Sequence, residues 1–296
     1  MALRTPDERF ENLPGYDYEP NYVEVDGTRL HYVDEGDGSG GETFLCLHGE
    51  PSWAYLYRKM VPGLAEQGRV VVPDLPGFGR SDKWEEQDDY TFGALYDAVE
   101  GFVEELDLTD VTLVGQDWGG ILGLSVAARN QERFVRLVPM NTGLPDGTAS
   151  MSDEWQQFHD FVEASDELPI GFLIDGACYT DLSDDVKEAY EAPFPDASYQ
   201  AGALELPLRI PTSPDDDGAD QIAETRELLS EWDKPAFVLF AENDPITRDA
   251  AGDLRSLIPT ADEQPEVWVE NAAHFLQEDA GERIAEHIVE FVERTG

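Results

Sequence analysis

Residues 111–120 read VTLVGQDWGG, a β-branched run that leads through small residues to Asp117 and then into an apolar segment. We predict a strand, a sharp turn and a helix here, with Asp117 at the bend. The flanking glycines fit this prediction, because a sharp turn leaves little room for Cβ atoms. The pattern is that of a nucleophile elbow, although an Asp that merely caps the following helix would give the same local sequence.

The composition describes an acidic globular chain. Of 296 residues, 64 are Asp or Glu and 19 are Lys or Arg, which gives a formal charge of −45. Hydrophobic residues make up 41%, enough for a folded core. Such acidity argues against nucleic-acid and anionic-membrane partners, and no apolar run is long enough to span a bilayer. Residues 1–20 lack the apolar stretch of a signal peptide, so we expect a cytoplasmic protein.

The charge also points to a salt-rich environment. The basic residues include only four lysines, Lys59, Lys83, Lys187 and Lys234. Dense surface carboxylates repel one another in dilute solution, whereas molar salt shortens the screening length to roughly 3 Å. We therefore expect a protein from a halophile, the alternative being an ordinary acidic protein. The two cysteines lie in separate apolar segments and are expected to be free thiols.

Short β-rich runs alternate with helical patterns, which predicts an α/β fold with a mostly parallel, eight-stranded sheet flanked by helices. The expected strands are residues 22–25, 29–34, 43–47, 69–72, 111–115, 134–139, 236–240 and 266–269. The expected helices are residues 55–66, 92–106, 121–130, 249–258 and 280–294. Residues 143–218 interrupt this alternation and are rich in aromatic residues and proline, with helical patches at 151–164 and 184–191. We predict a core of residues 1–142 and 219–296 and an inserted helical cap of residues 143–218.

Two further residues follow predicted strands, as Asp117 does. Asp244 comes after the strand at 236–240, and His274 comes after the last strand. Ligands of open parallel sheets bind beyond the carboxyl ends of the strands, so the three side chains are expected to meet. Separately, Asp244 could form a turn and His274 could be a core histidine. Together they follow the nucleophile–acid–histidine order of α/β-hydrolases.

The loop after the third expected strand reads HGEPSW from His48 to Trp53. In this fold an oxyanion hole forms from a backbone N–H of that loop and the N–H of the residue after the nucleophile. Here these are the amides of Glu50 and Trp118. His48 is expected to orient the loop rather than to act in catalysis.

An aspartate at the elbow predicts a particular reaction. A serine alkoxide that displaced a group from a saturated carbon would leave an ether, which water activated by His274 could not cleave. The carboxylate of Asp117 would instead give an ester, whose carbonyl water can attack with help from the oxyanion hole. The sequence therefore predicts displacement at an sp³ carbon followed by hydrolysis, with a halide or an epoxide oxygen as the leaving group.

The chain resembles haloalkane dehalogenases of the α/β-hydrolase superfamily over nearly its whole length. The matching stretches are HGEPSWAYLYRKM (48–60), PDLPGFGRSDK (73–83), GQDWGG (115–120), EAPFPDASYQAG (191–202) and AAHFLQE (272–278). The resemblance implies the triad Asp117, His274 and Asp244, with no cofactor and no metal. It also implies a halide held by two indole N–H groups, those of Trp118 and Trp155, although Trp155 could equally be a core residue of a cap helix.

The implied substrate is a small haloalkane, with halide, alcohol and a proton as products. Four aromatic residues are candidates for pocket lining or plain core, namely Phe158, Phe161, Phe172 and Phe275. The main alternative is an epoxide hydrolase with the same triad, which would need cap tyrosines such as Tyr179, Tyr190 and Tyr199 to protonate the epoxide. A non-catalytic binding module is a further alternative that the intact triad disfavours. The sequence does not fix the oligomeric state, and we expect a monomer.

Overall fold

The computed structural model describes residues 2–38 and 41–296. Its centre is an eight-stranded sheet in the order β10-β9-β8-β7-β4-β5-β3-β2. The strands of this sheet are β2 (Asn21–Val25), β3 (Thr28–Glu35), β4 (Glu42–Leu47), β5 (Gly68–Pro73), β7 (Val111–Gln116), β8 (Phe134–Met140), β9 (Leu239–Ala241) and β10 (Val267–Val269). β3 runs antiparallel to both β2 and β5, and the other neighbours are parallel. The predicted eight-stranded, mostly parallel sheet is therefore confirmed.

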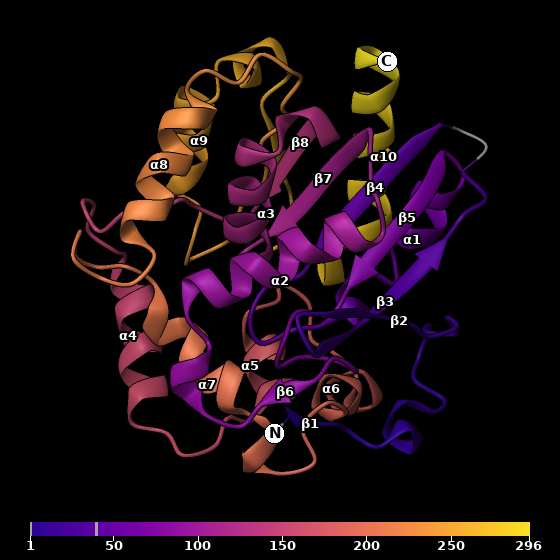
Figure 1. Ribbon diagram of the computed structural model, residues 1–296, viewed down its shortest axis with the longest axis vertical. Coiled ribbons are helices and arrows are strands. Elements are labelled where there is room, and N and C mark those ends of the chain that lie inside the picture. The colour runs from indigo at the N-terminus through magenta and orange to yellow at the C-terminus, as the bar shows by residue number, and fades with distance from the viewer. Residues whose placement is uncertain (1, 39–40) are drawn as a thin grey trace.

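Helices cover both faces of this sheet. The longer ones are α2 (Phe92–Glu105), α3 (Trp118–Arg129), α8 (Ala219–Leu229), α9 (Ala250–Leu257) and α10 (Leu276–Thr295). In Figure 1, α2 and α3 cross in front of the strands, while α10 lies behind them and contacts α1 (Val61–Ala65). β4 and β7, in the middle of the sheet, are buried almost throughout because both of their faces are covered.

One predicted helix was wrong. Residues 55–66 form a short 3₁₀ helix, η2 (Ala54–Tyr57), and the separate helix α1 instead of one continuous helix. Pro62 explains the break. In the interior of a longer helix it would lack the N–H that pairs with the carbonyl of Arg58, and its ring would clash there. In the structure Pro62 lies in the first turn of α1, where no such partner is needed.

Residues 143–218 contain four α-helices. These helices lie in the lower part of the molecule in Figure 1. They are α4 (Asp153–Glu163), α5 (Ile170–Gly176), α6 (Asp184–Glu191) and α7 (Ala201–Glu205), followed by the 3₁₀ turn η6 (Leu206–Arg209). α4 and α6 match the two helical patches that the sequence indicated, whereas α5 and α7 were not predicted. The small sheet of β1 (Ala2–Leu3) and β6 (Lys83–Trp84) was also missed.

The sequence predicts that no segment spans a bilayer and that the two cysteines are free thiols. No helix in the described part of the chain combines the length and apolar character needed to cross a bilayer. Both cysteines are free, as predicted. Cys46 is buried on β4, and Cys178 is partly exposed after α5.

Candidate active site

Asp117 occupies a strained bend between β7 and α3. Its backbone has φ 52° and ψ −127°, a conformation that residues other than glycine rarely adopt. The neighbouring glycines are required by close packing. A Cβ on Gly119 would lie 2.2 Å from the carbonyl oxygen of Leu47, and a Cβ on Gly49 would lie 2.2 Å from Oδ1 of Asp117. The predicted elbow is thus present, and its small residues are dictated by clearance.

The two residues that follow β8 hold the backbone of Asp117 by hydrogen bonds. The amide of Asp117 donates to the carbonyl of Asn141 over 3.1 Å. The hydroxyl of Thr142 donates to the carbonyl of Asp117 over 2.7 Å. The first residues after β8 therefore hold both polar groups of the Asp117 backbone, which keeps a strained conformation in place.

The three residues predicted to form a triad meet beyond the carboxyl ends of their strands. His274 Nδ1 lies 3.2 and 3.3 Å from the two carboxylate oxygens of Asp244. On the other side of the ring, His274 Nε2 lies 3.8 Å from Oδ2 of Asp117. The side chain of Asp244 is fully buried, whereas those of His274 and Asp117 are 8% and 18% exposed. The opening toward the exterior is therefore on the Asp117 side of the ring.

The pKa values of Asp117 and Asp244 are shifted in opposite directions. Burial raises the pKa of Asp117, and this outweighs the favourable effects of His274 and of the backbone N–H groups of Trp118 and Glu50. Burial also acts to raise the pKa of Asp244, but His274 and hydrogen bonds outweigh it, so that pKa is lowered. The pKa of His274 is raised, because Asp244 and Asp117 outweigh its desolvation. Asp244 is thus a stable anion beside the imidazole, while Asp117 is a less stabilised and more reactive one.

Asp244 has a hydrogen-bonding shell of its own. The amide of Ile246 donates to its Oδ1 over 2.9 Å, and the hydroxyl of Thr247 donates to its Oδ2. These donors satisfy the lone pairs that His274 leaves free, which is why a buried carboxylate stays ionised here. Thr247 was not identified from the sequence. A Thr three residues after an Asp in a turn is the signal that could have indicated it.

The predicted oxyanion-hole amides both lie at the carboxylate of Asp117. The N–H of Glu50 donates to Asp117 Oδ1 over 2.9 Å, and the N–H of Trp118 also stabilises this carboxylate. His48 serves the loop, as expected: it accepts from the amide of Leu75 over 2.9 Å and pairs with the carbonyl of Gly49. Burial lowers the pKa of His48, so the ring is neutral.

The side chain of Glu50 is buried beside the nucleophile. Burial and the charge of Asp117 raise its pKa well above the usual range, which keeps it protonated and neutral. Its Oε1 has no hydrogen-bond partner among the described residues. A second ionised carboxylate beside Asp117 would compete for the same donors, so a neutral Glu50 is compatible with an anionic nucleophile.

The two tryptophans expected to bind halide converge on η6. The indole N–H of Trp118 donates to the carbonyl of Leu206 over 3.2 Å, so it is engaged rather than free. A buried N–H needs a partner, and this carbonyl is the acceptor within reach. Trp155 is 5% exposed on α4, which contacts η6, and its ring packs on His159 with the centroids 5.1 Å apart. Their joint role at a halide stays a prediction, and for Trp118 it requires the bond to Leu206 to be shared or exchanged.

The remaining aromatic candidates differ in how far they are buried. Phe275 is buried and stands edge-on to the ring of His274, with the centroids 5.0 Å apart. Phe161 and Phe172 are 43% and 68% exposed, so their expected place in a pocket lining or core was wrong. Both lie off the buried faces of α4 and α5, which include Val162 and Ile174, whereas Phe158 packs against the core. Tyr190 donates its hydroxyl to Glu278 and is therefore engaged, and Tyr179 is 53% exposed.

Sequence reasoning missed two amide side chains at the triad. The Gln116 side-chain nitrogen lies 3.3 Å from His274 Nε2 and 3.4 Å from the His274 carbonyl oxygen. An amide N–H directed at Nε2 fits a neutral ring that carries its proton on Nδ1, facing Asp244. The second is Asn141, which donates to the carbonyls of Ala273 and His274. Both follow or end a predicted strand, and this position was the available signal.

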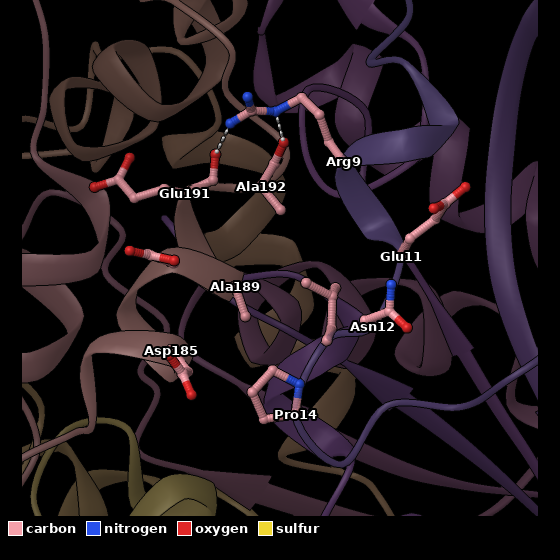
Figure 2. A pocket seen from close by; sticks show the side chains of 10 residues that line it. Arg9, Glu11, Asn12, Pro14, Asp185, Ala189, Glu191 and Ala192 are labelled. Atoms are coloured by element: carbon pink, nitrogen blue, oxygen red, sulfur yellow. Dashed lines mark hydrogen bonds between the residues drawn. The ribbon is translucent and has the colours of Figure 1, made fainter.

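Two other clusters lie away from the triad. A hollow of about 480 Å³ separates the N-terminal segment from α6, and Arg9 bridges its rim by donating to the carbonyls of Glu191 and Ala192 (Figure 2). Among residues 2–38 and 41–296, the side chains close enough together to hold a metal are His159, Asp160 and Glu163 on α4. Two of these three are exposed, and we assign no metal to them.

Comparison with known proteins identifies the fold and the family of the chain. The family model described as the alpha/beta hydrolase fold matches residues 42–281. A haloalkane dehalogenase from Psychrobacter cryohalolentis is 42% identical, with 98% of this chain and 97% of that protein covered. Haloalkane dehalogenase 1 from Mycobacterium tuberculosis is 44% identical, with 99% of each covered.

A solved structure gives the same result. It is a tetrameric haloalkane dehalogenase from Paraglaciecola agarilytica NO2, 39% identical, with a TM-score of 0.90 and 97% of both chains covered. Similarity at this level over whole chains favours this family over epoxide hydrolases, which share the aspartate at the elbow. The chain therefore belongs to the haloalkane dehalogenase family within the α/β-hydrolase fold.

Proposed function

We propose that this protein hydrolyses carbon–halogen bonds of small haloalkanes through a covalent ester on Asp117. The observation that carries the proposal is the set of contacts of one carboxylate. Oδ1 accepts the N–H of Glu50 at 2.9 Å, while Oδ2 faces His274 Nε2 at 3.8 Å. Oδ1 is thus held by a donor of the oxyanion hole, and Oδ2 is free to attack a carbon atom. Displacement followed by hydrolysis requires these two separate roles of the carboxylate oxygens.

In the first step, Asp117 Oδ2 attacks the carbon that bears the halogen. The carbon–halogen bond breaks, the halide leaves with the bonding electrons, and an alkyl ester forms. Oδ1 becomes the carbonyl oxygen of this ester, already held by the amide of Glu50. The raised pKa of Asp117 reflects a carboxylate with incomplete stabilisation, which retains nucleophilicity. Trp118 and Trp155 are the proposed donors to the departing halide, because an indole N–H on an apolar body suits a large, weakly hydrated anion.

In the second step, neutral His274 takes a proton from water, and the resulting hydroxide attacks the ester carbonyl carbon of Asp117. Negative charge develops on Oδ1, where the amides of Glu50 and Trp118 stabilise it. Asp244 stabilises the imidazolium and keeps the ring oriented. The bond between the ester carbonyl carbon and the alkoxide oxygen then breaks, the alkoxide takes the proton of the added hydroxyl group, and the carboxylate is regenerated. His274 gives its proton to solvent, so each turnover releases alcohol, halide and one proton.

The direct test measures halide and proton release from 1,2-dibromoethane and 1-bromobutane, with styrene oxide hydrolysis measured in parallel. We expect turnover of the haloalkanes and none of the epoxide. A His274→Phe variant should stop after the first step, leaving an alkylated Asp117 that mass spectrometry detects. Epoxide turnover without halide release would support the rival activity, and a His274→Phe protein without an adduct would contradict the covalent step.

We propose that residues 143–218 form a cap over the carboxyl ends of the strands. Support comes from contacts that this segment makes around the triad. Ala177 accepts from the amide of His274 over 3.0 Å, and Leu206 accepts from the indole of Trp118. Ala189 on α6 accepts from the indole of Trp53 over 3.2 Å. Substrate size would then be limited by this segment, which exchange of the whole segment with that of a relative would test through altered chain-length preference.

We also propose a cytoplasmic, salt-adapted protein. Sixty-four acidic residues against nineteen basic ones support the salt adaptation, because their mutual repulsion needs screening. The expectation of a cytoplasmic location rests on residues 1–20, which lack the apolar stretch of a signal peptide. Thermal unfolding in dilute buffer and in molar KCl tests the salt adaptation, and a large rise in melting temperature is expected. Equal stability in the two conditions would overturn it.

We propose a monomer, since a formal charge of −45 opposes self-association at low salt. The Paraglaciecola agarilytica relative is described as tetrameric. Light scattering after size-exclusion chromatography, in dilute and in molar salt, distinguishes the two states. A stable tetramer in both would contradict the proposal.

A further inference from the structure

Asn141 is a fully buried residue directly after β8, with a left-handed backbone (φ 36°). Asparagine tolerates this conformation better than most residues. Its backbone and its side chain have different partners. The backbone carbonyl accepts the amide of Asp117 over 3.1 Å, as described above, and any residue at this position could make that bond.

The side chain of Asn141 contacts the segments that carry the other two triad residues. Its Nδ2 donates to the carbonyl of Ala273 over 2.8 Å and to that of His274 over 2.9 Å. Its Oδ1 accepts the amide of Ala241, the last residue of β9, over 2.8 Å. One planar amide therefore joins the end of the strand that leads to Asp244 to the loop that holds His274.

The sheet itself gives this region little support. β8 and β9 pair at Met140 with Leu239, and β9 pairs with β10 only as far as Val269. Beyond these points the backbone of Asn243 adds one bond to the carbonyl of Ala272. His274 lies past the end of the ladder. Its amide donates to the carbonyl of Ala177 over 3.0 Å, and its carbonyl accepts from the side chains of Asn141 and Gln116, so these contacts set the angle of its ring toward Asp244.

We propose that the side-chain amide of Asn141 is a positioning group for the hydrolytic step, aligning His274 with Asp244 while leaving the nucleophile to its own backbone contacts. The inference rests on the proposed catalytic roles of these residues. It predicts that the two steps respond differently to the loss of this amide. Alkylation of Asp117 should persist, because residue 141 still offers its carbonyl. Hydrolysis should slow, because His274 loses its alignment.

Two variants test the inference. Asn141→Gly removes the side chain at no conformational cost at a positive φ, and Asn141→Asp keeps the acceptor for Ala241 but loses both donors. Rapid-quench mass spectrometry during single turnover of 1,2-dibromoethane separates the two rates. We expect hydrolysis to fall by at least about tenfold, the equivalent of one lost buried hydrogen bond, with accumulation of alkylated Asp117. Alkylation should change by less than about threefold on the same scale.

The control is Thr225→Val, which removes a buried hydroxyl bonded to the Gln221 carbonyl and to Ser125, at the contact of α3 and α8. It should lower the melting temperature without changing the ratio of the two rates. A folded Asn141 variant in which both steps slow equally, or neither changes, overturns the inference. If Asn141→Gly does not fold, Asn141→Asp decides alone. Absence of any adduct in His274→Phe would instead refute the proposed function, which keeps the two failures distinguishable.

Discussion

The bend at Asp117 and the inserted segment 143–218 both border the active site, yet they constrain sequence in different ways. At the bend, clearances decide each residue, as at Gly49 and Gly119, where an added Cβ would lie 2.2 Å from its neighbour. In the inserted segment the clearances vary. A Cβ on Gly171 would lie 2.5 Å from the carbonyl oxygen of Lys187, whereas Gly176 has nothing within 4 Å of such a Cβ and Phe172 is 68% exposed. Close packing therefore fixes the glycines at the bend, whereas the inserted segment combines such positions with open ones on α5.

The largest effect should follow from removing the nucleophile. Asp117→Ala is expected to lower kcat by at least about 10⁴-fold, because no other described carboxylate has the same oxyanion donors. Halide release under saturating substrate measures this loss. Residual turnover within about tenfold of wild type on that scale would show that the bend is not the reaction centre.

Asp244→Asn should come next, with a loss of about 10³–10⁴-fold in the hydrolytic step. Its pH profile carries the sharper information. In the wild type, the charge of Asp244 acts to raise the pKa of His274, and hydrolysis should increase with pH as the imidazole loses its proton. Without that charge the pKa of His274 falls, and the rising limb should move to lower pH. A limb that stays in place would mean that His274 is not the titrating base.

A pair of matched glycine variants tests the comparison itself. Gly49→Ala forces the loop or Asp117 to move, and we expect a loss of activity of about 10²-fold, as for other misplacements near a reacting group. Gly176→Ala, at the end of α5, should leave activity unchanged and add about 0.5–1 kcal/mol to the free energy of unfolding. Kinetics and chemical denaturation of both variants measure these outcomes. Equal tolerance at the two positions would remove the contrast between the regions.

Trp155→Phe should have a smaller effect, about tenfold on halide affinity, since it removes one hydrogen bond to an anion. Bromide inhibition constants measure it. Trp232→Phe is the control, because this buried indole has no hydrogen-bond partner among the described residues and lies after α8. Equal bromide constants for Trp155→Phe and the wild type would assign Trp155 to the packing of α4 alone.

The smallest effect concerns stability. Because burial raises the folded-state pKa of Asp117 above its ordinary value of 3.8, ionisation of this group destabilises the fold as pH rises through that interval. Asp117→Asn should therefore match the wild type below about pH 4 and be more stable above the folded-state pKa. Denaturant titrations at several pH values measure the difference. A variant less stable than the wild type at neutral pH would contradict the destabilising burial of the Asp117 charge.

The elbow and the sheet were predictable from sequence because local patterns determine them. Few local structures other than a strand followed by a sharp turn fit the β-branched run before Asp117 and the small residues around it. The helix expected at 55–66 does not form as one element, because Pro62 cannot lie in the interior of a helix. Asn141 was missed because the partners of its side chain lie on other strands and loops, so no spacing along the chain indicates them. Thr247 lies only three residues from its partner Asp244, and this spacing is a signal that the sequence did offer. α5 and α7 are short, and packing rather than propensity stabilises such helices.

The most direct test of the account is a single turnover in ¹⁸O-labelled water, followed by mass analysis of the peptide that contains Asp117. Because hydroxide attacks the ester carbonyl carbon, one heavy oxygen should remain in the Asp117 side chain, and the alcohol should carry none. Heavy oxygen in the alcohol alone would show that water attacks the substrate directly, and the covalent ester would then be excluded.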